Sequence, residues 1–283
     1  MAAQLSFPIT TDTYLDSRIG NDSQNYGAAN TVKVLINNNA TGDGSICRGL
    51  FRLPAELGLF EPGEIVEAKV LLYVWQDNTA DLDITLFPLK QNFVEGTGSA
   101  DGATWNTYDG TNAWLNLGGD FDTNNPVLGV KEEILDPDMH DRFFSWNIAA
   151  LLTNETARNE VMANGALLQI DEVQPPSTGN PRAPFTSSEA SFYDAAYRPH
   201  VQLTVIPRTP DIPQLSIAGG QIALDIAHCT PFVTNRIERT LDLTQSNGWT
   251  LVTNMVSTGS STNWTENLQP GWTNVFYRIR IPE

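Results

Sequence analysis

Short runs that alternate apolar and polar residues recur along most of the chain, and they constrain its fold more than any other feature. Alternation with a period of two residues is typical of β-strands that bury one face. Turn-forming clusters such as Glu61-Pro62-Gly63 separate the runs and predict reversals of the chain between them. Before residue 207 the runs lie at 31–36, 46–53, 65–75, 82–89, 143–148, 166–170 and 200–206.

Many short strands joined by turns predict an all-β fold. We expect residues 1–206 to form a jelly-roll-like β-sandwich. One short helix is predicted over 149–159, AALLTNETARN, because its apolar residues recur at helical spacing and the pair Asn164-Gly165 follows as a stop signal.

A proline-rich segment at 207–213, PRTPDIP, divides the chain. Proline has no amide proton for a strand ladder, so three prolines in seven residues predict an extended, semi-rigid linker. Residues 214–283 then form a second region with short strand patterns of its own. We expect a small β-sandwich domain there, with strands at 214–217, 221–226, 235–239, 250–252 and 275–281.

The charge balance excludes some classes of partner. The chain has 16 Lys and Arg against 33 Asp and Glu, a net charge of −17. A field of this sign repels nucleic acid and anionic membranes. No apolar run approaches the ~20 residues of a membrane-spanning helix. We therefore expect no nucleic-acid binding and no membrane insertion, whereas neutral glycans and divalent cations remain compatible partners.

Residues 93–122, FVEGTGSADGATWNTYDGTNAWLNLGGDFD, show neither a helical nor a strand period. A loop of this length inside a compact domain is uncommon and is usually functional or disordered. Trp105 and Trp114 favour an ordered loop, since disordered segments contain few aromatic residues. The segment is therefore the first place to look for a binding site.

Several motifs within residues 7–206 resemble those of the DNRLRE-type domains. They are TDTYLD at 11–16, RGLFRL at 48–53, VEGTG at 94–98, GATWN at 102–106, FTSSEA at 185–190 and YRP at 197–199. The resemblance implies an extracellular β-sandwich of the kind found in secreted proteins of bacteria and archaea. Some such domains are carbohydrate-binding modules for acidic polysaccharides such as alginate. The Asp-Asn-Arg-Leu-Arg-Glu signature of the family does not occur in this chain.

The C-terminal region resembles the small β domains that close many secreted proteins of planctomycete and verrucomicrobial bacteria. The motifs that carry this likeness are IERTLDL at 237–243, WTLV at 249–252 and FYRI at 276–279. Together the two resemblances imply a secreted protein, located outside the cell or on its surface. Cys47 and Cys229 are then either free buried thiols or a bridge between domains or chains.

Two groups of oxygen-bearing side chains are candidates for a structural calcium ion. One comprises Asp12 and Asp16, and the other lies in the long loop at Asp120 and Asp122. Calcium takes six to eight oxygen ligands, which loops usually supply. The alternative is that these aspartates form hydrogen bonds with nearby backbone amides in turns.

Aromatic and polar residues of the long loop are candidates for sugar binding. Tyr108, Asp109 and Trp114 are the residues expected at the surface, whereas Trp105 is better explained as a core residue, although it remains a candidate. Tyr193 and Arg198, shortly before the strand at 200–206, are further candidates. An aromatic ring can stack on the apolar face of a sugar, while a guanidinium or carboxylate bonds its hydroxyls.

No pattern in the sequence indicates catalysis. Glycoside hydrolysis needs two carboxylates facing across a cleft, and no spacing singles out such a pair. Tyr193, Arg198 and His200 are close enough in sequence for lyase chemistry, but the polar face of a strand explains them better. We therefore expect a protein that is not an enzyme. Either it binds polysaccharide through sandwich loops, or it is a structural subunit that joins copies of itself into an extracellular fibre, sheath or adhesin.

Overall fold

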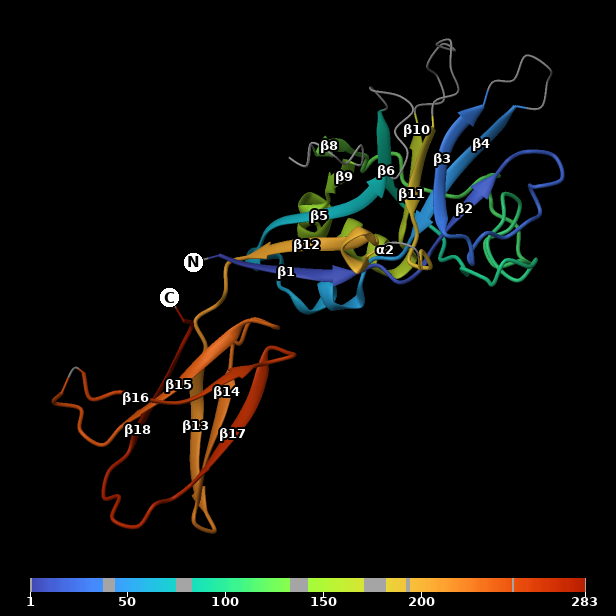
Figure 1. Ribbon diagram of the computed structural model, residues 1–283. Helices are drawn as coiled ribbons and strands as arrows, with labels where there is room; N and C mark the ends of the chain where they lie inside the picture. Colours follow the sequence, from blue (N-terminus) through green and yellow to red (C-terminus); the bar gives the residue numbers. More distant parts are fainter. Residues whose placement is uncertain are drawn as a thin grey trace. The chain divides into compact units, whose positions relative to one another are not determined.

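The computed structural model describes residues 2–37, 44–74, 83–132, 142–170, 182–191, 194–245 and 247–282, and it is built mainly of β-strands (Figure 1). The chain divides into two compact units. The N-terminal unit comprises Ser6–Leu57 and Glu67–Leu203, and the C-terminal unit comprises Thr204–Glu283 with Met1–Leu5 and Gly58–Val66. The all-β prediction is confirmed.

One large antiparallel sheet dominates the N-terminal part of the fold. Its strands follow the order β1-β12-β5-β11-β3-β4-β10-β6-β7, with β2 paired to β4 and β9 bridging β5 and β8. Figure 1 shows β1, β12 and β5 running across the direction of β3 and β4. The strands are β1 (Ala3–Pro8), β2 (Asp12–Asp16), β3 (Thr31–Asn37), β4 (Ser45–Phe51), β5 (Ile65–Val74), β6 (Ile84–Pro88), β7 (Val127–Leu128), β8 (Val130–Glu132), β9 (Arg142–Asn147), β10 (Ala166–Ile170), β11 (Arg182–Thr186) and β12 (His200–Val205).

Aromatic side chains fill the core of the N-terminal unit. Trp146 is fully buried, and its ring centroid lies 5.9 Å from those of Phe144 and Phe185. The indole N–H of Trp146 donates to the carbonyl of Ile84 at 2.9 Å, so its one polar atom is satisfied. Burial of each such side chain contributes roughly 1.5–3 kcal/mol.

The strands predicted from alternation are present, but β1, β2, β7, β8, β11 and β17 were not predicted in that way. In β2 every residue from Asp12 to Asp16 is buried, so no alternation marks it. Asp12 and Asp16, two of the candidate calcium ligands, therefore lie on a strand and not in a loop of the kind that usually supplies such ligands. Both aspartates lie on a strand paired with β4, Asp12 opposite Phe51 and Asp16 opposite Cys47.

The predicted helix over 149–159 is two helices. These are α1 (Ala149–Thr153) and α2 (Glu155–Asn164). Asn154 separates them because its backbone is extended and its side chain accepts a hydrogen bond from the amide of Ala157, which makes it the N-cap of α2. The described residues also form three short 3-10 helices, η1 (Ala55–Leu59), η2 (Pro62–Glu64) and η3 (Ala195–Tyr197).

The C-terminal unit contains two three-stranded sheets, β13-β14-β17 and β16-β15-β18. A single apolar cluster lies between them, with Ile222, Leu224 and Ile237 fully buried, as a small sandwich requires. The strands are β13 (Asp211–Ala218), β14 (Gln221–Ala227), β15 (Thr234–Thr240), β16 (Thr250–Val256), β17 (Ser261–Asn267) and β18 (Phe276–Arg280).

The linker predicted at 207–213 is shorter in the structure, because β13 begins at Asp211 and includes Pro213. The strand tolerates this proline for two reasons. It lies at the edge of its sheet, and its register with β14 shifts between Asp211 and Gln214. Cys47 and Cys229 are buried free thiols in different units. Among the described residues, no helix is long and apolar enough to cross a membrane.

Candidate metal centre beside a cavity

Three carboxylates from distant parts of the N-terminal unit converge at one point. Asp12 begins β2, Glu95 lies in the long loop, and Glu189 lies in the turn after β11. One oxygen from each carboxylate can be chosen so that all three atoms lie within 4.8 Å of one another. Asp12 is the most deeply placed of the three and retains 2% of its accessible surface.

The long loop is anchored so that Glu95 reaches this point. The buried amide of Asn25 donates to the carbonyls of Glu95 and Ala103, at 2.5 and 2.9 Å. Gly96 follows with a φ of +78°, and a Cβ there would come within 2.5 Å of the Asn25 side-chain oxygen. The close approach therefore requires glycine next to Glu95.

Each carboxylate of the cluster accepts a hydrogen bond on one oxygen. Glu95 Oε1 accepts from the backbone amide of Asp12 at 2.6 Å. Asp12 Oδ2 accepts from the amide of Ser188 at 2.7 Å, and Glu189 Oε1 accepts from the Ser188 hydroxyl at 2.8 Å. The second oxygens of Asp12 and Glu189 are buried and accept no hydrogen bond from any of the described residues.

The electrostatics of the cluster are unfavourable for three ionised groups. Burial, with the nearby charges of Glu189 and Glu95, raises the pKa of Asp12 to about 8. Burial likewise raises the pKa of Glu95, although the positive charge of Arg52 opposes that shift. Arg52 itself donates from Nη2 to the carbonyl of Phe93, and its Nε is buried without a partner.

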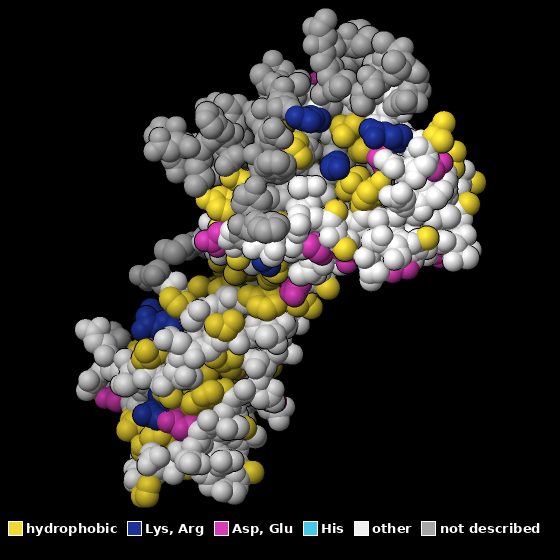
Figure 2. Space-filling view, turned by 45° about the vertical axis from the view of Figure 1, so that its right-hand side comes forward, with side chains coloured by type: hydrophobic (Ala, Val, Ile, Leu, Met, Phe, Trp, Pro, Cys, Tyr) yellow, Lys and Arg dark blue, Asp and Glu magenta, His cyan; other side chains and the backbone are white. Residues whose placement is uncertain are grey.

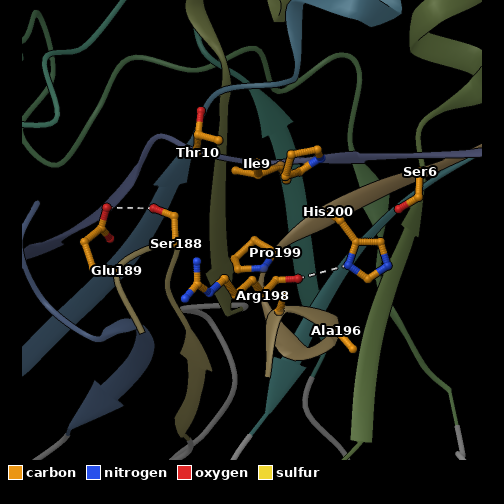
Figure 3. Close-up of a pocket in the computed structure, with 11 residues that line it drawn as sticks. Ser6, Ile9, Thr10, Ser188, Glu189, Ala196, Arg198, Pro199 and His200 are labelled. Atoms are coloured by element: carbon orange, nitrogen blue, oxygen red, sulfur yellow. Dashed lines mark hydrogen bonds between the residues drawn. The ribbon is translucent and has the colours of Figure 1, made fainter. Parts of the chain in front are cut away.

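A cavity of about 500 Å³ adjoins the cluster and shares Ser188 and Glu189 with it. The remaining lining residues come from the end of β1, the segment that follows it, and the region around η3 and the start of β12 (Figure 3). The lining consists of Ser6, Pro8, Ile9, Thr10, Ser188, Glu189, Ala195, Ala196, Arg198, Pro199 and His200.

Arg198, a predicted ligand residue, lies in this cavity. Figure 3 shows its side chain extending toward Ser188, and its Nε is buried without a hydrogen-bond partner. The Arg198 carbonyl lies 2.9 Å from His200 Nδ1. Since a carbonyl only accepts, Nδ1 carries a proton and the imidazole ring is held in one orientation.

The aromatic residues of the long loop are mostly internal. Trp114 retains 4% exposure and donates from its indole to the carbonyl of Thr104, so the expectation that it lies at the surface is wrong. Tyr108 is half-buried against Trp114, with ring centroids 5.7 Å apart. The guanidinium carbon of Arg48 lies over the Trp105 ring, 5.0 Å from the ring centroid. These rings, together with Phe93, Ala103 and Phe121, hold the loop on the sandwich.

Asp109 lies nearer the surface and accepts hydrogen bonds from the amides of Thr111 and Asn112, at 2.9 and 2.6 Å. These bonds account for its position as a turn residue and lower the pKa of its carboxyl, with the Asn112 amide contributing most. Tyr193 lies outside the described residues. Of the predicted ligand residues, only Arg198 lines the cavity.

The other predicted calcium ligands accept hydrogen bonds from neighbouring groups. Asp120 accepts from the amides of Leu115 and Asn116, at 2.6 and 2.7 Å, and Asp122 accepts from the Asn125 side chain at 2.5 Å. Asp16 accepts from the Arg18 amide and the Asn21 side chain, both at 2.9 Å. These hydrogen bonds to nearby groups are what the alternative explanation predicts, in which the aspartates stabilise local turns and bind no calcium. Within the described residues, a grouping suited to a metal forms around Asp12 only.

Glu95 and Glu189 were not predicted as metal ligands. Both occur in motifs that carry the family resemblance, VEGTG and FTSSEA, which provided their only sequence signal. The chain matches no protein-family profile, and no curated protein sequence matches it. The site is therefore interpreted from its geometry.

Proposed function

We propose that this protein binds a polysaccharide in the cavity beside Arg198, without cleaving it. The observation that supports this proposal is the cavity itself. Its volume of about 500 Å³ falls within the range of small-molecule sites, roughly 300–1,000 Å³. Its lining combines apolar surface with a few polar groups that point inward (Figure 3).

The lining suits a sugar unit chemically. Pro8, Ala195 and Ala196 are exposed and offer apolar surface for the C–H face of a pyranose ring. Ser6 and Thr10 supply hydroxyls that both donate and accept. Arg198 supplies guanidinium donors for ligand oxygens.

The charges at the cavity favour a neutral polysaccharide. Arg198 and Glu189 are of opposite sign, and the net charge of −17 repels an anionic polymer. An acidic polysaccharide, which the family resemblance implies, would depend on Arg198 to bind its carboxylate. Comparing neutral with acidic polysaccharides therefore identifies the class of ligand.

Binding without catalysis fits the placement of the carboxylates. Glycosidases use two carboxyl groups that both reach the scissile bond, at separations of roughly 5 to 9.5 Å. Glu189 is the one carboxylate among the residues that line the cavity. Asp12, whose pKa is raised as that of a general acid would be, retains 2% exposure and is shielded from a polymer in the cavity.

The test is retention on immobilised neutral and acidic polysaccharides, measured for the full chain with calcium and again with EDTA. We expect Arg198→Ala to weaken binding at least tenfold. Arg236→Ala on β15 is the matched control, since it removes the same charge in the other unit, and it should bind like the wild type. Failure of the wild type to bind any polysaccharide under either condition would exclude this function.

One observation favours the alternative function, a structural subunit. The edge strand β13 exposes Leu215 and Ile217, at 46% and 61%, although they lie opposite the buried residues Leu224 and Ile222. Figure 2 shows apolar side chains over this unit on the face displayed. An exposed apolar edge strand is a template for pairing with another copy. A structural subunit would form large species in light scattering that Ile217→Lys disperses, whereas a monomer at high concentration argues against it.

A further inference from the structure

We propose that Asp12, Glu95 and Glu189 bind one divalent cation, and that calcium is the ion whose size and ligand preference match the site. The inference goes beyond sugar binding: Glu189 also lines the cavity, but Asp12 and Glu95 do not, and an ion can bind there whether or not a sugar does. It also differs from the predicted calcium sites, since it joins Asp12 to two glutamates instead of to Asp16.

The strongest indication is a buried carboxylate oxygen without a partner. Asp12 retains 2% exposure, its Oδ1 accepts no hydrogen bond, and the same holds for the buried Glu189 Oε2. An unsatisfied buried carboxylate oxygen costs more than an ordinary lost hydrogen bond, so native structures rarely leave one. A cation bound at the cluster would supply the missing partner for the buried Asp12 oxygen.

Ligand preference selects among cations. Calcium takes six to eight oxygen ligands at 2.3–2.6 Å in flexible geometry, so irregularly placed carboxylates can hold it. One oxygen from each of the three carboxylates lies within 4.8 Å of the others, so one ion can reach all three. Magnesium demands near-ideal octahedral geometry and usually takes only one or two carboxylates, so a set of three favours calcium.

The hydrogen bonds around the cluster orient its carboxylates before an ion arrives. The Asp12 amide, the Ser188 amide and the Ser188 hydroxyl each hold one oxygen of a different carboxylate. The opposite oxygens of Asp12 and Glu189 are thereby left for the ion. Such supporting contacts fix ligand geometry in metal sites.

Charge leads to the same conclusion. Three carboxylates face each other, and Arg52, the basic residue near Glu95, uses its Nη2 on the carbonyl of Phe93. A divalent cation would offset two of the three negative charges and remove the mutual repulsion. Calcium sites outside cells commonly have dissociation constants of about 0.1–1 mM, and this number of carboxylates places the site at or below that range.

The experiment measures the metal content of the full-length protein as purified and after dialysis against EDTA, followed by calorimetric titration with CaCl₂ and MgCl₂. We expect one equivalent of calcium to bind, with at least tenfold preference over magnesium. The melting temperature should rise by about 5 °C or more at a calcium concentration a hundredfold above the dissociation constant.

Variants assign the binding to these residues. Asp12→Asn and Glu189→Gln should each weaken calcium binding at least tenfold. Glu56→Gln, at an exposed position of η1, makes the same charge change and should leave binding unaltered. If Asp12→Asn fails to fold, Glu189→Gln carries the test because Glu189 is only half-buried.

Two results would contradict the proposed calcium site. One is wild-type protein that is free of metal as purified and does not bind calcium at millimolar concentration. The other is calcium binding that neither variant weakens. Neither result depends on a polysaccharide, so failure of the metal site and failure of sugar binding can be told apart.

Discussion

The two units of this protein bury carboxylates in different ways. In the C-terminal unit, Glu238 retains 3% exposure and lies between Arg278 and Arg280, with charge-assisted hydrogen bonds of 2.7 and 3.1 Å. Glu64 there also accepts from Arg208, at 2.9 Å. In the N-terminal unit, Asp12 is equally buried, yet its nearest charged partners are Glu95 and Glu189.

This contrast shows what a fold must add when it buries charge. A buried carboxylate needs an opposite charge or several donors, otherwise its neutral form is favoured. Arginines supply the charge at Glu238, and backbone amides supply donors at Asp120. At Asp12 one amide donates while two carboxylates repel, and this imbalance is why we propose that an external cation binds there.

The largest effect is expected where the buried charge pair is broken. Glu238→Gln removes the charge held by Arg278 and Arg280. Breaking a buried pair costs about 3–5 kcal/mol, but both arginines are roughly 40% exposed and regain water, so we expect about 2–3 kcal/mol. Urea denaturation of the full chain measures the loss in the transition of the C-terminal unit. Arg236→Gln, on the same strand, should change stability by less than about 0.5 kcal/mol.

The next effect concerns a carboxylate satisfied by amides. Asp120→Ala leaves the amides of Leu115 and Asn116 without their acceptor and should destabilise the N-terminal unit by about 2 kcal/mol. Because the hydrogen bonds suffice without a metal, the loss should be the same in calcium and in EDTA. If Asp120→Ala reduced stability only in calcium-containing buffer, Asp120 would again be a candidate calcium ligand. Asp109→Ala, in a similar but exposed turn, should cost less.

A smaller effect of opposite sign is expected at Asp12. In EDTA at pH 9, above the raised pKa of Asp12, Asp12→Asn should stabilise the protein by about 1 kcal/mol, since it removes repulsion from Glu95 and Glu189 and adds an amide donor to the cluster. In calcium the wild type should become the more stable of the two. Asp16→Asn is the matched control on the same strand: it should destabilise the protein, because Asp16 accepts two hydrogen bonds from Arg18 and Asn21. Destabilisation by Asp12→Asn in EDTA would remove the contrast between the two units.

The sequence predicted the fold where burial alternates and failed where it does not. On β12, Val201, Leu203 and Val205 are buried in turn, and the strand was predicted within one residue. On β2 all five residues are buried, so period two is absent. The helix prediction missed the break at Asn154 because the apolar spacing continues through it, while the capping side chain ends one helix and begins the next.

The candidate site could be predicted only in part. Asp12 was recognised as a potential ligand, but its contacts to Glu95 and Ser188 span 83 and 176 residues, and no local spacing encodes them. Trp114 illustrates the opposite error. A tryptophan in a polar loop resembles a binding residue, whereas here it is the apolar anchor that holds the loop on the core.

The smallest effect is the pH dependence at Glu238. Burial alone would raise the pKa of this carboxyl, but the hydrogen bonds and charges of Arg278 and Arg280 outweigh it and hold the pKa below its usual value. A lowered pKa in the folded state contributes stability that is present above the ordinary value of 4.5 and is lost as the pH falls through the folded value. The stability difference between wild type and Glu238→Gln should therefore be constant near neutrality and shrink below about pH 4.5. Urea midpoints at pH 7 and pH 3.5 measure this, and a difference that persists undiminished at pH 3.5 would mean that the contribution of Glu238 is packing rather than charge.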